Sequence, residues 1–122
     1  MKKAVIAFVV FAGLAASARA SDATEYRAFA IYNDTGRAMT YQVRWGSGAW
    51  KAHTLPAGKG HTHSYTDFDD SPAPFPQVAF AATPGAGWSL HNPDTDKVTD
   101  KRNAPRQSFR IDGYGRVSIG RR

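Results

Sequence analysis

Apolar and polar residues alternate with a period of two through much of this chain. The clearest run carries apolar side chains at every second position: Met39, Tyr41, Val43 and Trp45. Successive side chains of a strand point to opposite faces of a sheet, so a run of this kind buries one face only. No window of comparable length has a helical period. The pattern therefore predicts a fold built from half-buried β-strands.

Similar runs recur along the rest of the chain. Phe29 and Ile31 alternate in the first of them. Further strands are predicted at 50–55, 60–66, 77–82, 87–91, 107–112 and 116–120. Each run is short and is bounded by Gly, Pro, Asp or Ser, as is usual for strands joined by turns.

The first turn is predicted to join two paired strands, because residues that face each other across a hairpin must point the same way. A three-residue loop at 34–36, with its glycine in the left-handed conformation, sets Ile31 opposite Met39 and Phe29 opposite Tyr41. Apolar side chains of one strand then face apolar side chains of the other. The match favours an antiparallel hairpin.

Two further turns give matched faces in the same way. A loop at 47–48 sets Trp45 opposite Trp50 and brings Arg44 and Lys51 together on the polar side. Near the C-terminus, a loop at 113–115 sets Ile111 against Val117 and Phe109 against Ile119. Together the three turns indicate an antiparallel meander.

Proline-rich segments separate these hairpins. Residues 56–58 and 71–76 break the strand pattern, because proline cannot donate to a β-ladder. We expect them to cross between sheets. The predicted fold is all-β: a small antiparallel β-sandwich of about seven or eight strands, Ig-like in architecture, with a small β-barrel as the alternative. Residues 92–106 are polar and aperiodic, and we expect a mobile loop there or a bulge carrying a binding edge.

The N-terminus has the three zones of an export signal. Lys2 and Lys3 are followed by the apolar stretch 4–16, and residues 18–20 (Ala-Arg-Ala) form a cleavage site. The apolar stretch is shorter than the roughly 20 residues that span a bilayer. We therefore expect residues 1–20 to be cleaved and 21–122 to form a single secreted or periplasmic domain that does not span the membrane.

Cleavage also changes the charge. The full chain carries +6, and loss of three basic residues from the signal takes 16 basic residues to 13 against 10 acidic ones, which leaves +3. Nucleic-acid binding usually shows as a dense basic stripe, whereas these basic residues are scattered among Asp residues. No nucleic-acid partner is predicted. The chain has no Cys, and so no disulfide.

His61 and His63 are the sharpest chemical feature. Alternate residues of a strand project to one face, so the two imidazoles can share a copper or zinc ion, although zinc normally has about four ligands. The residues that could complete such a site are His53, His91, Asp67, Asp69 and Asp70. The alternative interpretation is a polar strand face with solvated histidines.

Catalytic signatures are missing. The single Glu, Glu25, lies near the predicted mature N-terminus, and residues 46–48 (Gly-Ser-Gly) lack the spacing of a serine nucleophile turn. No base, nucleophile and orienting group stand in a recognisable arrangement, and no cofactor motif is present. We expect a non-enzymatic protein without a cofactor.

The leading functional hypothesis is a binding module. Its ligand-binding residues are predicted to be Arg44, Lys51 and His53 on a polar strand face, together with Tyr114 at a hairpin tip. Two like charges set opposite each other cost stability unless a partner offsets them. The predicted partner is another envelope protein or an anionic surface. Copper or zinc binding by His61 and His63 is the alternative function.

Overall fold

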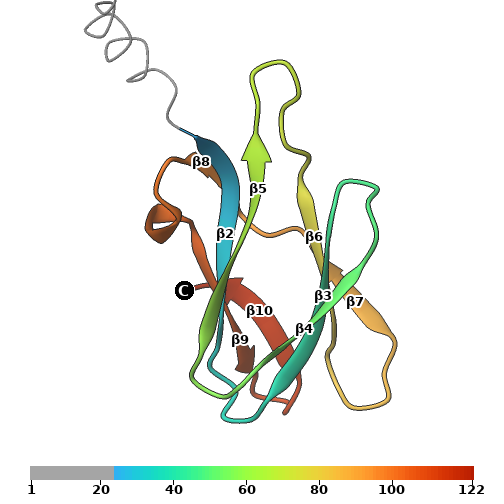
Figure 1. Ribbon diagram of the computed structural model, residues 1–122. Coiled ribbons are helices and arrows are strands. Elements are labelled where there is room, and N and C mark those ends of the chain that lie inside the picture. The colour runs from blue at the N-terminus through green and yellow to red at the C-terminus, as the bar shows by residue number, and fades with distance from the viewer. Residues whose placement is uncertain (1–23) are drawn as a thin grey trace, which may run out of the picture.

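Two β-sheets packed face to face make up the part of the protein that the structure describes. The computed structural model describes residues 24–122, and Figure 1 shows the sheet that contains β2 and β5 beside the sheet that contains β3 and β6. The strands are β2 (Glu25–Asn33), β3 (Met39–Trp45), β4 (Lys51–Leu55), β5 (Gly60–Asp67), β6 (Pro76–Ala81), β7 (Trp88–His91), β8 (Asp96–Val98), β9 (Arg106–Ile111) and β10 (Val117–Arg121). The predicted all-β sandwich is confirmed.

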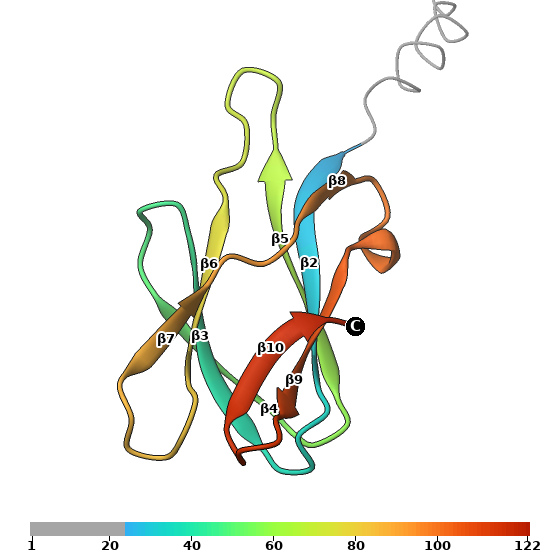
Figure 2. The ribbon, with the colours of Figure 1, turned by 180° about the vertical axis from the view of Figure 1, so that it is seen from behind.

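The strand order shows how the layers are built. One sheet runs β10-β9-β2-β5, with β8 also paired to β2, and the other runs β4-β3-β6-β7. Seen from behind, β9 and β10 lie beside the C-terminus of the chain (Figure 2). The predicted export signal, 1–20, lies outside the described residues. Within those residues, no helix has the length and apolar character needed to cross a membrane.

The first predicted hairpin is wrong. β2 and β3 belong to different sheets, and residues 34–38 carry the chain from one sheet to the other. The expected left-handed glycine is present, since Gly36 has φ 85°. Facing strands of a sandwich present apolar side chains to the same core, so matched faces fit a crossing as well as a hairpin. The predicted crossings near 56–58 and 71–76 are confirmed.

The β3–β4 hairpin forms, but its predicted register is wrong by one residue. Val43 pairs with Lys51 and Tyr41 with His53. Residues 46–50 join the two strands, so the connection is longer than the two residues expected. Within it, Gly46 has a left-handed φ of 59° and donates its N–H to the carbonyl of Phe75. A shift of one residue moves a side chain to the other face of the sheet. Lys51 and His53 therefore lie on the inner face.

The β9–β10 hairpin has the predicted register, with Val117 opposite Ile111 and Ile119 opposite Phe109. A continuous antiparallel meander is nevertheless not formed. β2 lies in the middle of its sheet and pairs in parallel with β9 as well as antiparallel with β5 and β8.

The late segment 92–106, expected as a mobile loop or a bulge, contains structure. β8 pairs with β2, and a short 3-10 helix, η1 (Lys101–Asn103), follows it. Val98 and Ala104 pack on Ala28 of β2 in a small second cluster. The segment thereby covers part of the outer face of the five-stranded sheet.

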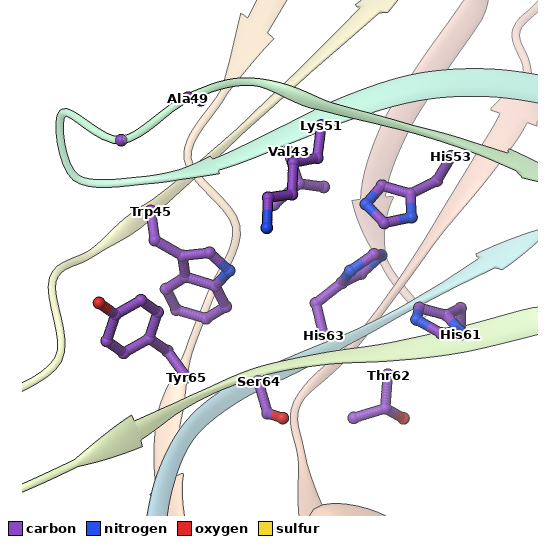
Figure 3. Close-up of a pocket in the computed structure, with 11 residues that line it drawn as sticks. Val43, Trp45, Ala49, Lys51, His53, His61, Thr62, His63, Ser64 and Tyr65 are labelled. Carbon is purple, nitrogen blue, oxygen red and sulfur yellow. The ribbon is translucent and has the colours of Figure 1, made fainter.

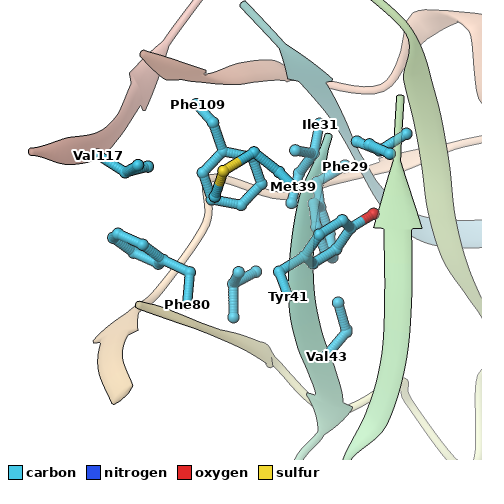
Figure 4. Packing of buried hydrophobic residues seen from close by; sticks show 10 residues of the cluster. Phe29, Ile31, Met39, Tyr41, Val43, Phe80, Phe109 and Val117 are labelled. Carbon is cyan, nitrogen blue, oxygen red and sulfur yellow. The ribbon is translucent and has the colours of Figure 1, made fainter. Parts of the chain in front are cut away.

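The main core fills the space between the sheets (Figure 4). Its buried members are Phe29, Ile31, Met39, Tyr41, Val43, Leu55, Val78, Phe80, Phe109 and Val117. Trp45 packs against the edge of this cluster. Trp88 and Leu90 point outward from the edge strand β7 and are 53% and 62% exposed.

Asn33 ties the crossing between β2 and β3 to the opposite sheet. Its side chain is fully buried and donates to the carbonyls of Arg37, at 2.6 Å, and Leu55, at 2.9 Å. Its amide oxygen accepts from the backbone N–H and the hydroxyl of Thr35. Buried polar groups are costly unless they are paired, and this one amide satisfies several of them.

Asn33→Ala is expected to lower the free energy of unfolding by about 3 kcal/mol, because it leaves the carbonyl of Leu55 and the groups at the crossing without their partner. Urea denaturation measures the loss. Asn103→Ala, at an exposed position of η1, is the matched control and should change stability by less than about 0.5 kcal/mol. Equal effects of the two substitutions would contradict the role given to Asn33.

Candidate functional site

Three of the four histidines gather on one open side of the sandwich. β4 and β5 are edge strands of opposite sheets, and residues 56–59 join them directly. The inner face of β4 carries His53, and the inner face of β5 carries His61 and His63. These two faces form the walls of a cleft of about 470 Å³, into which all three imidazoles project (Figure 3).

The imidazoles form a compact triangle, called here the histidine cluster. The ring centres of His61 and His63 are 4.6 Å apart, those of His53 and His63 are 4.7 Å apart, and those of His53 and His61 are 5.9 Å apart. Two of these contacts are edge-on and the third is stacked. His63 is buried, His53 is half-buried and His61 is exposed. The cluster therefore runs from the core to the solvent.

Tyr41 anchors the buried end of the cluster. Its ring is fully buried, and its hydroxyl lies 2.7 Å from Nε2 of His63 in the facing sheet. The Tyr41 ring also stacks on His53, with ring centres 5.5 Å apart. Burial raises the pKa of Tyr41, so the phenol stays protonated at neutral pH.

The cluster disfavours positive charge. Burial, reinforced by His61 and His53, lowers the pKa of His63 to about 3. Burial also lowers the pKa of His53, with further contributions from His61 and Lys51. Desolvation penalises the charged form of an imidazole, and neighbouring cations add to that penalty. His53 and His63 are consequently neutral at pH 7, and their ring nitrogens can act as ligands without first losing a proton.

In the structure, the three imidazoles of the cluster do not point to one common position. Among the described residues, no group of three or more His, Asp or Glu side chains is arranged to hold a metal ion. The hydrogen bond to Tyr41 fixes the His63 ring, whereas His61 is exposed and free to turn. Rotation between staggered side-chain wells is the adjustment that metal binding would require.

The other end of the same cleft is aromatic and basic. Trp45 and Tyr65 form one wall, with ring centres 5.5 Å apart. The Lys51 side chain reaches into the cleft between the Trp45 ring and the imidazoles (Figure 3). Within residues 24–122, no Asp or Glu lines this cleft. The space is therefore electropositive.

The structure places the predicted ligand-binding residues on different parts of the surface. Lys51 and His53 line the cleft, whereas Arg44 points to the outer face, where its guanidinium donates to Oε1 of Gln77 at 2.8 and 3.0 Å and lies over the Trp50 ring. The like-charged pair of Arg44 and Lys51 that motivated the hypothesis does not form. Tyr114 is 85% exposed at the β9–β10 turn and does not line the cleft.

The remaining candidate metal ligands lie elsewhere. His91 of β7 contacts Gln107, 3.4 Å away. Asp67 accepts the backbone N–H of Ala73 and pairs with Lys97 at 3.1 Å. Asp69 and Asp70 lie in the exposed β5–β6 connection. Of the residues proposed to complete a site, only His53 joins His61 and His63.

Tyr65, Trp45 and Tyr41 were not predicted as site residues. Tyr65 continues the alternation of His61 and His63 on the inner face of β5, so the period-two pattern contained the signal. Trp45 and Tyr41 share a face that the sequence assigned only to the core. Which core residues border an opening depends on how the two sheets meet, which the pattern of one strand does not contain.

Comparison of the chain with protein-family models, with curated proteins and with solved structures found no match.

Acidification is expected to destabilise the metal-free protein before its carboxylates titrate. Unfolded His63 binds a proton near its ordinary pKa of 6.5, whereas folded His63 does so only near about 3. The unfolded state therefore binds more protons in this window, and stability falls as pH is lowered through it. In His63→Gln, which cannot titrate, the slope of unfolding free energy between pH 6 and 4.5 should fall by about 1.4 kcal/mol per pH unit.

Urea denaturation at several pH values, in the presence of a chelator, measures this slope. The slope of His63→Gln is compared with that of His91→Gln, which also loses one imidazole but leaves the cluster intact. An unaltered slope in His63→Gln would show that His63 titrates alike in the folded and unfolded states.

Proposed function

We propose that this protein is a non-catalytic binding module that takes up a divalent transition-metal ion, copper or zinc, on the imidazoles of His53, His61 and His63. The observation that carries the proposal is the triangle of ring centres, 4.6, 4.7 and 5.9 Å apart. With Zn–N bonds of about 2.0–2.1 Å, the ring centres of two imidazoles on one tetrahedral ion lie about 5 Å apart. The spacing of the three ring centres is close to that of imidazoles on one ion, and the rings must turn before their nitrogens point to a common position.

The hydrogen bond between Tyr41 and His63 also supports the proposal of metal binding. Metal-bound histidines usually donate their second ring N–H to a fixed acceptor, which holds the ring and the tautomer in place. When Nε2 of His63 donates to the Tyr41 hydroxyl, the lone pair of Nδ1 is left for the ion. A neutral imidazole is also the form that binds metal.

The energetic cost of adjusting the cluster is small. His61 is exposed and His53 is half-buried, so their rings can turn toward a common point while the fixed ring of His63 stays in place. Such turns cost on the order of 1 kcal/mol, whereas binding free energies of structural zinc sites are about 10 kcal/mol or more. The rotation is therefore no barrier to binding.

Equilibrium dialysis of chelator-stripped protein against Cu²⁺ or Zn²⁺, followed by elemental analysis, tests the proposal. About one ion per chain is expected at pH 7.5, because the cluster supplies three imidazole ligands. His61→Gln should weaken binding at least about tenfold, since it removes one ligand.

The fourth histidine provides the matched control. His91→Gln removes an imidazole that lies outside the cluster and should leave the stoichiometry and affinity unchanged. The position of His61 on the surface makes loss of folding in His61→Gln unexpected, and circular dichroism checks it. Stoichiometry near zero in the unaltered protein would overturn the proposal.

We also propose that the module works outside the cytoplasm. The support is the three-zone pattern at 1–20, with its small residues before Ser21. Mass spectrometry of the protein recovered after expression with its natural N-terminus is expected to find a chain that begins at Ser21. Recovery of the full-length chain alone would contradict export by cleavage.

A further inference from the structure

We propose that the same cleft binds a small carboxylate attached to a six-membered ring. The anion would lie between Lys51 and the metal ion, and the ring would lie against Trp45 and Tyr65. The inference rests on the proposed metal site and deepens it, because it names what occupies the rest of the cleft.

The positive charge of the cleft favours an anionic ligand. Three neutral imidazoles would leave a divalent ion with its full charge of +2, and Lys51 adds a further cation beside it. Among the described residues, no acidic side chain lines the cleft and Lys51 forms no ion pair. Zinc held by three protein ligands keeps its fourth position for water or an exogenous group. A carboxylate oxygen suits both cations.

The aromatic end of the cleft favours a ligand that contains a ring. Trp45 packs against the core and is therefore held in place, while Tyr65 is 46% exposed beside it, at an angle of 46° between their planes. Aromatic faces of this kind contribute apolar contact area at little cost in side-chain entropy. Exposed aromatic area within a cleft favours a ligand that has a flat apolar face.

The two ends belong to one space. Lys51, His53, Trp45 and Tyr65 line the same cleft, and Figure 3 shows the Lys51 ammonium group between the aromatic wall and the imidazoles. A compact ligand can therefore present its carboxylate toward Lys51 and the histidines while its ring contacts the wall. Aromatic acids and sugar acids share this chemistry.

Isothermal titration calorimetry of Zn²⁺-loaded protein with benzoate and with glucuronate tests the inference and separates the two sources. At least one of them is expected to bind, and at least about tenfold more tightly than its neutral counterpart, benzyl alcohol or glucose, because a charge-assisted contact contributes about 1.4 kcal/mol or more. Acetate, which has no ring, should bind at least about tenfold more weakly than the preferred probe.

Two substitutions locate the binding. Lys51→Gln and Tyr65→Ser should each weaken the preferred probe at least about fivefold while the zinc stoichiometry stays near one. Lys59→Gln and Tyr114→Ser are the matched controls, because both residues are exposed and lie outside the cleft lining, and neither should change the affinity.

The outcomes separate the two proposals. Zinc stoichiometry near one without binding of benzoate or glucuronate overturns this inference and leaves metal binding intact. Equal affinity in Lys51→Gln, or in zinc-free protein, also overturns it, because the carboxylate would then lie elsewhere. Zinc stoichiometry near zero overturns both.

Discussion

The hydrogen bond between Tyr41 and His63 is the contact on which both the core and the cleft depend. Tyr41 lies at the centre of the sandwich, with its ring packed on Phe109, and a phenol in that position cannot reach water. A buried hydroxyl without a partner destabilises a fold by about 1–3 kcal/mol. The facing sheet supplies the partner as a histidine, so a polar group is present where an aliphatic residue would otherwise fill the core.

His63 lies beside His53 and His61 because β4 and β5 are joined across the open side of the sandwich. β4 and β5 are edge strands of opposite sheets, connected through 56–59, and their inner faces line an open cleft. His53 and His61 lie along this opening, so the imidazoles extend from the buried Tyr41 outward. A wholly structural role for His63 would not require the other two. Their presence beside Lys51, with no carboxylate from the described part of the chain, gives the opening its chemical character.

The sequence predicted the strands better than their partners. Period-two alternation located the inner face of β3 and the shared face of His61 and His63, because the pleat fixes it locally. Partners were harder to predict, because a crossing and a hairpin both bring apolar faces together. The turn after β2 was accordingly read as a hairpin, and parallel pairing of β2 with β9 was not foreseen.

The candidate site was predicted in part for the same reason. His61 and His63 follow from one strand, whereas the place of His53 depends on the β3–β4 register. The turn, which contains the left-handed Gly46, is longer than the two residues expected, and the register differs by one residue from the predicted one. This shift places Lys51 and His53 in the cleft instead of on the outer face beside Arg44. Strand periodicity does not contain such a shift, since the length of the connection decides it.

The order of these elements along the chain has a consequence for how the protein is assembled. Tyr41 and the three histidines all lie within residues 41–63, so only short loops must close to bring them together, whereas the parallel pairing of β2 with β9 joins residue 33 to residue 109. Loop-closure entropy grows with the length of chain enclosed. During synthesis, which starts at the N-terminus, the residues of the cleft are made well before β9 and β10. Their contacts enclose short loops and therefore cost little loop-closure entropy.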